Sequence, residues 1–481
     1  MSVIRPAAVV VLAAGEGTRM KSATPKVLHE ICGRSLVGHV LASARQLDPE
    51  NLVVVVGHAR EKVTAHLAGI DPAVRTAVQE QQNGTGHAVR MALQELGGSV
   101  EGTVVVVCGD TPLLTGDTLA QLAATHSADG NAVTVLTAEM PDATGYGRIV
   151  RDDSGAVTAI VEHKDASETQ REIREINSGV FAFDGALLAD ALKQVRTDNS
   201  QGEEYLTDVL GILREAGHRV GASVAADHRE IAGINNRVQL SEARRILNER
   251  LLTAAMLGGV TVVDPASTWI DVTVTFEQDA VVHPGTQLTG ATHLAEGAEV
   301  GPNSRLHDTR VGAGARVDNT VSDGAEVGPE ASVGPFAYLR PGTRLGRKGK
   351  IGTYVETKNA EIGEGTKVPH LSYVGDATIG EYTNIGAASV FVNYDGEKKH
   401  HTTVGSHCRT GSDNMFVAPV TVGDGAYTAA GSVITKDVPP GSLAVARGQQ
   451  RNIEGWVARK RPGSAAAKAA EAASREPGGE G

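Results

Sequence analysis

An aliphatic residue, usually followed by glycine, recurs every six residues between Val300 and Ile434. The step is unbroken in two runs, which are Val327, Val333, Leu339, Leu345, Ile351 and Val404, Thr410, Phe416, Val422, Thr428, Ile434. A period of six fits neither a helical face at 3.6 residues nor a single strand at 2. It predicts a coil of three short strands per turn, in which each strand contributes one inward side chain and a glycine or small polar residue occupies each corner.

The alternative for this stretch is an ordinary antiparallel β domain with regular turns, but the step is too regular over too many turns to favour it. The pattern resembles the left-handed parallel β-helix of hexapeptide repeats. Because such a coil runs against the usual right-handed crossover preference, the hexads must specify it strongly. It buries its own core while its flat faces still need partners, and coils of this type commonly associate as trimers. The resemblance therefore implies a homotrimer.

The first half of the chain follows a different pattern. Continuous apolar runs at 7–12, 52–56 and 104–108 are separated by helical patterns. Such runs predict buried strands, and their alternation with helices predicts an α/β, Rossmann-like domain with a mainly parallel sheet. Ligands of these sheets bind at the carboxyl ends of the strands. We therefore expect the chemistry of this half at the residues that directly follow the apolar runs.

A helical pattern joins the two halves. Apolar residues recur at helical spacing at Leu240, Ala243, Leu247, Leu251 and Ala254. This spacing predicts a linking helix that stops at the glycine pair 258–259. With 481 residues the chain is too long for one core. We expect an α/β domain over 1–237, the linking helix over 238–258, the coil over 259–461, and a disordered tail rich in Ala, Gly and Glu over 462–481.

Composition narrows the class of protein. There are 45 basic and 57 acidic residues, which give a net charge of −12 without a basic stripe, so nucleic acid is not an expected partner. The three cysteines, Cys32, Cys108 and Cys408, are not spaced as metal ligands and are expected to be small buried hydrophobes of a protein in a reducing cytoplasm. The apolar start runs into a polar loop rather than a cleavage site, and no apolar run is long enough to span a bilayer.

The loop after the first apolar run carries the first chemical signal. Residues 13–20 have the sequence AAGEGTRM and are followed by Pro25 and Lys26. Its two glycines let the backbone approach a ligand and point N–H groups at phosphate oxygens, while Arg19 and Lys26 add positive charge. The dinucleotide fingerprint is excluded, because a third glycine and a later acidic residue are missing. The combination resembles the signature of sugar-1-phosphate nucleotidyltransferases.

Asp110 directly follows the third apolar run. A carboxylate there suits Mg²⁺, which takes one or two protein oxygens and completes its shell with phosphate and water. Taken alone, Asp110 could equally be a helix cap or a turn carboxylate. Later polar motifs could each be loops without chemistry, but their order and wording resemble uridylyltransferases that make UDP-N-acetylglucosamine. These motifs are residues 79–88, 145–148, 162–165, 177–179, 201–208 and 233–237.

That resemblance implies roles for single residues. UTP would be held by Leu12, Ala13, Ala14, Gly15, Lys26, Gln79, Gly84, Thr85 and Asp110. The sugar phosphate would be held by Gly147, Glu162 and Asn177, and Mg²⁺ by Asp110 and Asn235, with Asn235 also at the nucleotide sugar. Attack of a sugar-phosphate oxygen on the α-phosphorus of UTP needs alignment and charge neutralisation more than a protein nucleophile. Arg19, Lys26 and the metal would supply that neutralisation.

Residues that interrupt the hexads must project from the coil, so chemistry is expected there. One interruption spans 352–361 and a second, very polar one spans 392–403. The second includes a histidine pair, which lacks the further ligand spacing of a metal site. His370 lies instead within an intact hexad framework, where a lone histidine is usually structural. Polar residues of neighbouring turns could, however, converge with it on an anionic sugar: Arg340, Lys358, Tyr373, Asn384, Asn393 and Tyr394.

This half resembles the family of bifunctional enzymes that join an acetyltransferase to the uridylyltransferase. The resemblance implies that His370 is the general base for the glucosamine amine as it attacks acetyl-CoA, and histidine titrates near neutral pH, which suits that task. Arg340 and Lys358 would hold the phosphate, with Tyr373 and Asn384 on the sugar. Acetyl-CoA would be held by Ala387, Asn393, Tyr394, Ser412, Ala430 and Arg447. The family commonly has glycine where this chain has Ala388, whose methyl group could narrow the thioester pocket.

The sequence thus predicts a cytoplasmic enzyme that acetylates glucosamine-1-phosphate in its second half and uridylylates the product in its first half, with acetyl-CoA and UTP as co-substrates and Mg²⁺ as cofactor. Two alternatives stay open. One is a nucleotidyltransferase whose coil only assembles or regulates it, against which His370 and Lys358 argue. The other is a non-catalytic trimeric module that senses a nucleotide sugar, against which Arg19, Lys26 and Asp110 argue.

Overall fold

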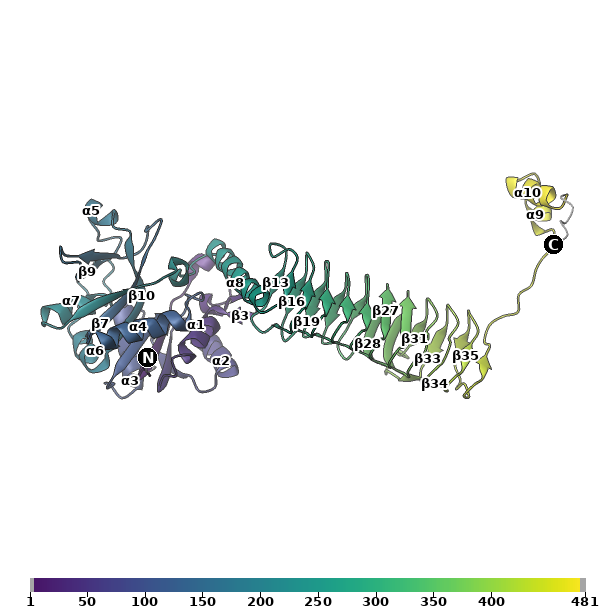
Figure 1. Cartoon of the computed structure of the whole chain (residues 1–481), viewed down its shortest axis with the longest axis horizontal. Helices are drawn as coiled ribbons and strands as arrows, with labels where there is room; N and C mark the ends of the chain where they lie inside the picture. Colours follow the sequence, from purple (N-terminus) through teal and green to yellow (C-terminus); the bar gives the residue numbers. More distant parts are fainter. Residues whose placement is uncertain (1–3, 476–481) are drawn as a thin grey trace. The chain divides into compact units, whose positions relative to one another are not determined.

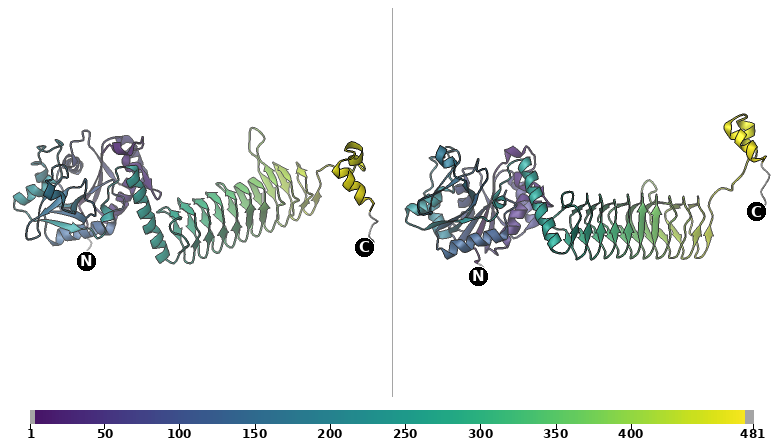
Figure 2. Two further views of the ribbon diagram at one scale, coloured as in Figure 1. Left: turned by 90° about the horizontal axis from the view of Figure 1, so that it is seen from above. Right: turned by 45° about the horizontal axis from the view of Figure 1, so that its top comes forward.

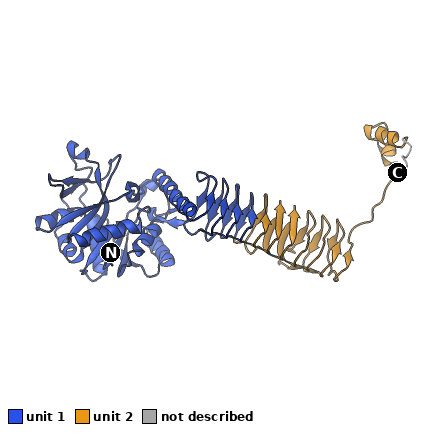
Figure 3. Cartoon of the chain, in the orientation of Figure 1, with its two compact units in different colours: residues 1–323 blue, residues 324–481 orange. Residues whose placement is uncertain are grey.

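The structure is a computed structural model that describes residues 4–475. It consists of two compact units, residues 1–323 and 324–481, which are coloured separately in Figure 3. The first unit contains the α/β domain, the linking helix and the first turns of the coil, and the second contains the later turns and the C-terminal helices (Figure 1).

The α/β part of the first unit is built on one sheet with the strand order β11-β7-β10-β6-β1-β4-β5. Its strands are β1 Ala8–Ala13, β4 Asn51–Val56, β5 Arg75–Val78, β6 Thr103–Cys108, β7 Val133–Glu139, β10 Glu175–Asp184 and β11 Val220–Val224. β1 pairs in parallel with both β4 and β6, while β10 is antiparallel to β6 and β7. The apolar runs are therefore central strands of a mainly parallel sheet, as predicted.

Two hydrophobic layers flank this sheet because successive side chains of a strand point to opposite faces. Val10 packs with residues of α3, α6 and α7, whereas Val9 packs with residues of α1, α2 and α4. The helices of this part are α1 Leu36–Arg45, α2 Arg60–Ile70, α3 Thr85–Glu95, α4 Gly116–Ala128, α5 Glu168–Arg171, α6 Gly185–Leu192 and α7 Asp208–Glu215. Smaller elements are the hairpins β2 Glu30–Ile31 with β3 Arg34–Ser35 and β8 Arg148–Arg151 with β9 Val157–Val161, and the 3₁₀ helices η1 Thr18–Met20, η2 Lys26–Leu28 and η3 His228–Ile231.

Helix α8, Arg237–Leu257, occupies the position expected for the linking helix. The Asn236 side chain caps it by accepting from the amides of residues 238 and 239, and Gly258 ends it. Asn248 attaches the helix to the first turn of the coil, because its Nδ2 donates to Thr268 O at 2.8 Å and its Oδ1 accepts from Ile270 N at 3.0 Å.

The coil part of the first unit consists of very short strands, each of which pairs in parallel with the strand three places further along. The columns are β12-β15-β18-β21, β13-β16-β19-β22 and β14-β17-β20. The strands are β12 Thr261–Val262, β13 Trp269–Ile270, β14 Thr275–Phe276, β15 Val281–Val282, β16 Gln287–Thr289, β17 His293–Leu294, β18 Glu299–Val300, β19 Arg305–His307, β20 Arg310–Val311, β21 Arg316–Val317 and β22 Val321–Asp323. Three strands therefore make one turn, as the six-residue period predicts.

The second unit continues with short parallel strands, which Figure 2 shows as successive turns. They are β23 Glu326–Val327, β24 Ser332–Val333, β25 Tyr338–Leu339, β26 Arg344–Leu345, β27 Lys350–Thr353, β28 Glu356–Ile362, β29 Lys367–His370, β30 Tyr373–Ile379, β31 Val390–Val392, β32 Thr402–Val404, β33 Met415–Val417, β34 Val420–Val422, β35 Tyr427–Thr428, β36 Val433–Ile434 and β37 Leu443–Ala444. Every residue of the two unbroken hexad runs is buried, and the most exposed of them, Thr410, is only 7% exposed. The fold class expected from the hexads, a left-handed parallel β-helix, is confirmed.

The C-terminal tail differs from its prediction. We expected residues 462–481 to be disordered, but α10 spans Ala465–Ala473 and follows the short α9, Trp456–Lys460. Alanine has the highest helix propensity, and the Ser464 hydroxyl caps α10 by accepting from Ala467 N at 3.1 Å. The composition that indicated disorder is thus also that of a good helix. Residues 476–481 lie outside the described residues.

Candidate active sites

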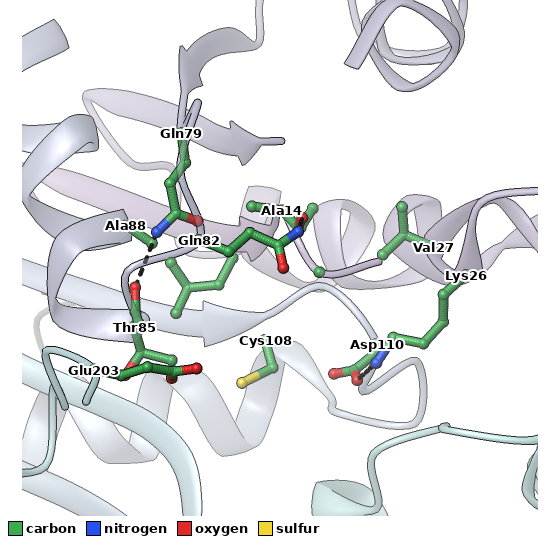
Figure 4. Close-up of a pocket in the computed structure, with 14 residues that line it drawn as sticks. Ala14, Lys26, Val27, Gln79, Gln82, Thr85, Ala88, Cys108, Asp110 and Glu203 are labelled. Atoms are coloured by element: carbon green, nitrogen blue, oxygen red, sulfur yellow. Dashed lines mark hydrogen bonds and ion pairs between the residues drawn. The ribbon is translucent and has the colours of Figure 1, made fainter. Parts of the chain in front are cut away.

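A cavity of about 260 Å³ lies at the carboxyl ends of β1 and β6 (Figure 4). It is lined by Leu12, Ala13, Ala14, Gly15, Lys26, Val27, Gln79, Gln82, Gly84, Thr85, Ala88, Cys108, Asp110 and Glu203. All nine residues predicted to hold UTP, from Leu12 to Asp110, line this cavity. The residues predicted for UTP therefore meet in one cavity at the strand ends, where ligands of parallel sheets bind.

Four polar side chains meet on one side of the cavity although they lie up to 216 residues apart. Lys26 Nζ forms an ion pair with Asp110 Oδ2 and donates to Asn235 Oδ1 at 3.3 Å. Arg19 Nη2 donates to the same amide oxygen at 2.9 Å. Ile234 N donates to Asp110 O at 3.0 Å, which holds the segment of Asn235 beside β6. The arrangement places two cations beside two oxygen donors.

The oxygen donors Asp110 and Asn235 suit a hard divalent cation. No group of three or more His, Cys, Asp or Glu side chains lies together in the described residues. A cation here would therefore depend on phosphate oxygens and water for the rest of its shell, as Mg²⁺ does when it binds with a nucleotide.

Glycines allow the loops around the cavity to approach their neighbours. At Gly17 a Cβ atom would lie 2.5 Å from Lys26 Cβ, and at Gly84 it would lie 2.5 Å from Glu204 O. Both glycines have positive φ, at 66° and 107°, where other residues are strained. The two glycines thus serve close backbone packing around Lys26 and the loop before α3.

Two glutamines orient the opposite wall. Gln79 Nε2 donates to Gly84 O at 3.0 Å and lies 3.1 Å from His87 Nδ1, and Gln82 Nε2 donates to Ala14 O at 2.9 Å. The Gln82 bond ties the loop after β5 to the loop after β1, while the Gln79 contacts join the two ends of the loop before α3. Amides and open backbone in this position can read the edge of a base.

The residues predicted for the sugar phosphate form a separate group beside the cavity. Asn177 N donates to Gly147 O at 2.9 Å, and a Cβ atom at Gly147 would lie 3.4 Å from Glu162 Oε1. Burial raises the pKa of Glu162, and the charges of Asp165 and Asp208 raise it further. None of these three residues lines the cavity itself, but Asn177 lies on β10, the strand next to β6.

The residues predicted for acetyl transfer lie on successive turns of the second unit. Strand register aligns Tyr373 with Glu356 of the preceding turn, and Glu356 Oε1 accepts from Arg340 Nη1 at 2.8 Å. Asn393 Nδ2 donates to Tyr373 OH at 3.3 Å and to Asp376 Oδ2 at 2.5 Å. Parallel register therefore gathers side chains of four successive turns on one face.

Positive charge is concentrated on that face. The positive charge of Lys399, and to a lesser extent that of Arg340, lowers the pKa of Lys358. Three cationic groups without an equal number of carboxylates form a natural site for a phosphate dianion.

His370 ends β29 at an exposed corner of the coil. Main-chain bonds stack this corner turn on turn: Ala388 N donates to His370 O at 3.1 Å, Asp413 N to Ala387 O at 2.7 Å, and Gly431 N to Ser412 O at 2.9 Å. His370, Ala387 and Ser412 therefore follow one line along the coil, with Ala430 at its next turn. Asn384 lies between His370 and Ala387 in the sequence, and its main-chain oxygen accepts from Thr410 N at 3.0 Å.

Two residues predicted for acetyl-CoA are placed apart from this line of contacts. Tyr394 is 57% exposed, and its hydroxyl donates to Gly396 O within the 392–403 loop. Arg447 is exposed after β37. Ala388 occupies the corner itself with φ at 58°, in the region that favours glycine.

Comparison with known proteins assigns the chain to a family. A family model described as the MobA-like NTP transferase domain matches residues 9–176. The bifunctional proteins GlmU of Streptomyces avermitilis and Streptomyces coelicolor are 89% and 87% identical over 481 residues, the full length of each chain. The bifunctional protein GlmU of Corynebacterium aurimucosum is 61% identical over 474 residues, which cover 98% of this chain and 97% of that protein.

The chain belongs to the GlmU family. It is therefore an enzyme of UDP-N-acetylglucosamine synthesis with acetyltransferase and uridylyltransferase activities, and it acts on small molecules. This excludes both alternatives that the sequence left open. No helix of the described residues 4–475 is long and apolar enough to cross a membrane.

Several residues of the two candidate sites are not among those predicted from the sequence. Five unpredicted residues line the cavity, namely Val27, Gln82, Ala88, Cys108 and Glu203. Lys399 was missed on the cationic face, although its place in a polar interruption of the hexads was a usable signal.

Cys108 corrects a prediction. We expected all three cysteines to be small buried hydrophobes, which holds for Cys32 and Cys408, but Cys108 is only partly buried and faces the cavity (Figure 4). It ends β6 just before Asp110, so the strand-end rule could have found it. Burial raises the pKa of its thiol to about 12, which argues against a thiolate nucleophile.

Proposed function

We propose that the two activities use acetyl-CoA and UTP at the two sites described above. In the second unit, glucosamine-1-phosphate is acetylated to N-acetylglucosamine-1-phosphate. In the first unit, the product attacks the α-phosphorus of UTP, which gives UDP-N-acetylglucosamine and pyrophosphate. The strongest support is the single cavity that collects Gly15, Lys26, Gln79, Gly84 and Asp110 from the three connections that follow β1, β5 and β6.

For uridylyl transfer, the cavity would hold UTP, with Gln79 and the backbone of Gly84 and Thr85 at the base and residues 12–15 near the phosphates. Arg19 and Lys26 would face the phosphates and offset their charge. Gly147, Glu162 and Asn177 would hold the sugar phosphate in line with the α-phosphorus. This division needs no protein nucleophile.

The residues present fit Mg²⁺, because Asp110 and Asn235 offer a carboxylate and an amide oxygen side by side through their shared contact with Lys26. These two residues would hold the ion. When bound, the ion supplies neutralisation of the triphosphate charge.

For acetyl transfer, Arg340 and Lys358, joined by Lys399, would hold the sugar phosphate, and Tyr373 and Asn384 the sugar. His370 would accept the proton of the glucosamine amine as its nitrogen attacks the thioester carbonyl carbon. The C–S bond would then break, and the proton would pass from His370 to the sulfur, so that coenzyme A leaves as its thiol. Acetyl-CoA would be held by Ala387, Asn393, Tyr394, Ser412, Ala430 and Arg447.

We further propose a homotrimer. Three apolar side chains, Phe336, Tyr354 and Leu371, are 55–60% exposed and occupy successive turns of the corner that carries His370. The rings of Phe336 and Tyr354 stack with centroids 5.6 Å apart. An exposed apolar column of this kind favours association with further copies of the chain, which would bring additional residues to His370.

We place the enzyme in the cytoplasm. The free thiols of Cys32, Cys108 and Cys408 fit a reducing compartment.

The test supplies purified protein with glucosamine-1-phosphate, acetyl-CoA, UTP and Mg²⁺, and measures free thiol and pyrophosphate separately. We expect both products, and thiol release without UTP. Absence of thiol together with pyrophosphate from ready-made N-acetylglucosamine-1-phosphate would contradict the acetyl site. Thiol release without pyrophosphate from either sugar phosphate would contradict the assignment of the cavity.

A further inference from the structure

One motif found in the sequence has no role in the assignments above. Residues 199–206, which we call the strap, follow α6 and lead towards α7. The strap lies along the loop before α3, which forms part of the cavity wall. Glu204 N donates to Asn83 O at 2.8 Å, and Gly86 N donates to Glu204 O at 2.8 Å. Leu206 N adds a bond of 3.0 Å to Thr85 Oγ1.

The main chains of the strap and of the loop before α3 are packed so closely that no side chain would fit between them at Gly84. A Cβ atom at Gly84 would lie 2.5 Å from Glu204 O and 2.8 Å from Glu204 N. The main chain of Glu204 therefore determines where the main chain of Gly84 and Thr85 can lie. A loop with glycine at positive φ has little rigidity of its own, so it depends on such a neighbour.

An ion pair holds Glu204 in place. Arg90 Nη2 lies 2.6 Å from Glu204 Oε1 and 2.8 Å from Oε2, and the two side chains are only 35% and 18% exposed. Arg90 belongs to α3, which begins at Thr85. The strap is thus linked to the cavity loop in two ways. Its main chain bonds directly to the loop, and the Glu204 side chain binds Arg90 of α3, the helix that continues from the loop.

The other end of the strap reaches the predicted sugar-phosphate side. Lys164 Nζ donates to Gln201 Oε1 at 3.1 Å, and Gln201 Nε2 donates to Tyr205 OH at 2.7 Å. Lys164 belongs to the same polar motif as Glu162. The strap therefore contacts both motifs that the two substrates of uridylyl transfer are proposed to use.

We propose that Arg90 and Glu204 are positioning residues for uridylyl transfer. Their ion pair presses the strap against the loop over 83–86 and so sets the main chain of Gly84 and Thr85 for UTP. Neither charged group is assigned a contact with substrate. Small displacements of a binding group lower the rate steeply, since alignment is a main source of catalysis in this reaction. The inference rests on the proposed UTP site and deepens it.

The test uses Glu204→Gln and Arg90→Lys in the full-length protein. Glu204→Gln keeps the size of the side chain but removes its charge, and we expect the KM for UTP to rise by about tenfold. Arg90→Lys keeps the charge but replaces the guanidinium with a shorter, differently placed ammonium group, and we expect a smaller rise. The double variant should be no worse than Glu204→Gln, because both changes break one interaction.

Two controls separate positioning from general damage. Glu95→Gln breaks a matched pair on the same helix, since Arg75 Nη2 lies 2.9 Å from Glu95 Oε1 at 45% and 41% exposure and outside the cavity. We expect this variant to leave the KM for UTP unchanged. Thiol release from acetyl-CoA should also stay unchanged in all variants and reports an intact second unit.

The outcomes distinguish this inference from the proposed function. An unchanged KM for UTP in Glu204→Gln, or an equal rise in Glu95→Gln, would overturn the positioning role while leaving the UTP site intact. Absence of pyrophosphate in the unmodified protein would instead refute the proposed site. Loss of thermal stability without a change in KM would also overturn the positioning role, because it would reduce the pair to a structural contact.

Discussion

The two candidate sites of this protein are built in different ways. In the first unit, loops that start from different strands converge on a cavity, and single contacts such as Lys26 with Asp110 hold it together. In the second unit, strand register places the site residues on successive turns of a repeating coil, as for Glu356 and Tyr373. A change in any one loop should therefore disturb the cavity of the first unit. The site of the second unit should be disturbed by changes in the core of the coil that carries it.

Exposure separates the sites as well. Lys26 and Asp110 have side chains that are 13% and 20% exposed, so their unit alone shields them from water. His370 and its apolar neighbours are exposed on a corner of the coil. If the chain forms the proposed homotrimer, another copy would cover the second site, whereas the first site is shielded by residues of its own unit.

The largest expected effects come from two substitutions that each remove one of the two activities and spare the other. His370→Ala removes the proposed general base and should lower thiol release by about 10²- to 10⁴-fold, while pyrophosphate release persists. Asp110→Ala should do the reverse, because it removes a proposed metal ligand and the partner of Lys26. Parallel assays of both products measure this. A folded, trimeric variant that loses both activities would refute independent sites.

A change in the coil core should damage the stacked site without touching it. Phe391 and Phe416 are fully buried and their ring centroids are 5.0 Å apart. Phe416→Ala should destabilise the coil by about 3–5 kcal/mol, because it leaves a cavity and removes an aromatic contact. The half-life of acetyltransferase activity at raised temperature should fall, while that of uridylyltransferase activity should not.

The control for this prediction is Tyr427→Ala, since Tyr427 is 52% exposed on the neighbouring β35. Its effect on stability should be small. Equal loss of both activities in Phe416→Ala would mean that the units do not unfold separately.

Acid should weaken the first unit through His39. Its imidazole is buried in α1 with Nε2 2.9 Å from Ile31 O, and burial, with a smaller effect from Arg34, lowers its pKa to about 4. Between pH 6.5 and about 4 the unfolded chain binds a proton that the folded unit does not. Stability should therefore fall as pH falls through this range, by on the order of 3 kcal/mol in full.

Urea unfolding at pH 7 and pH 4.5 measures this effect, with His39→Gln as the non-titrating comparison. The variant should lose less stability between the two pH values than the unmodified protein. A difference between the two proteins that does not change with pH would contradict the assignment to His39.

How far the sequence predicts each region follows from the same comparison. The coil could be predicted best, since one rule decides the inward positions of both unbroken runs, Val327 to Ile351 and Val404 to Ile434. The cavity loops could be located at strand ends, but side chains such as Gln82 could not be placed in it. Their directions depend on contacts between distant segments, such as Gln82 with Ala14, that no local pattern encodes. The tail helix could not be predicted from its pattern, because an alanine-rich segment without an apolar period is typical of disorder as well as of a helix.

The smallest expected effect concerns Ala388, which has φ at 58° on the corner beside His370. Ala388→Gly relieves backbone strain of about 1 kcal/mol but gives the unfolded chain more freedom, so the net change in stability should stay below about 1 kcal/mol. Loss of the methyl group should widen the proposed thioester pocket and lower the KM for acetyl-CoA about two- to fivefold. Steady-state kinetics of thiol release measure it.

Lys348→Gly is the matched control, because Lys348 has φ at 54° at another corner of the coil. It should share the effect on the backbone and leave the KM for acetyl-CoA unchanged. A KM that rises in Ala388→Gly would mean that the methyl group contacts the acetyl donor rather than obstructing it. Ala388 would then be a substrate contact. Its position would still be decided by the strand register of the coil and not by contacts with other loops.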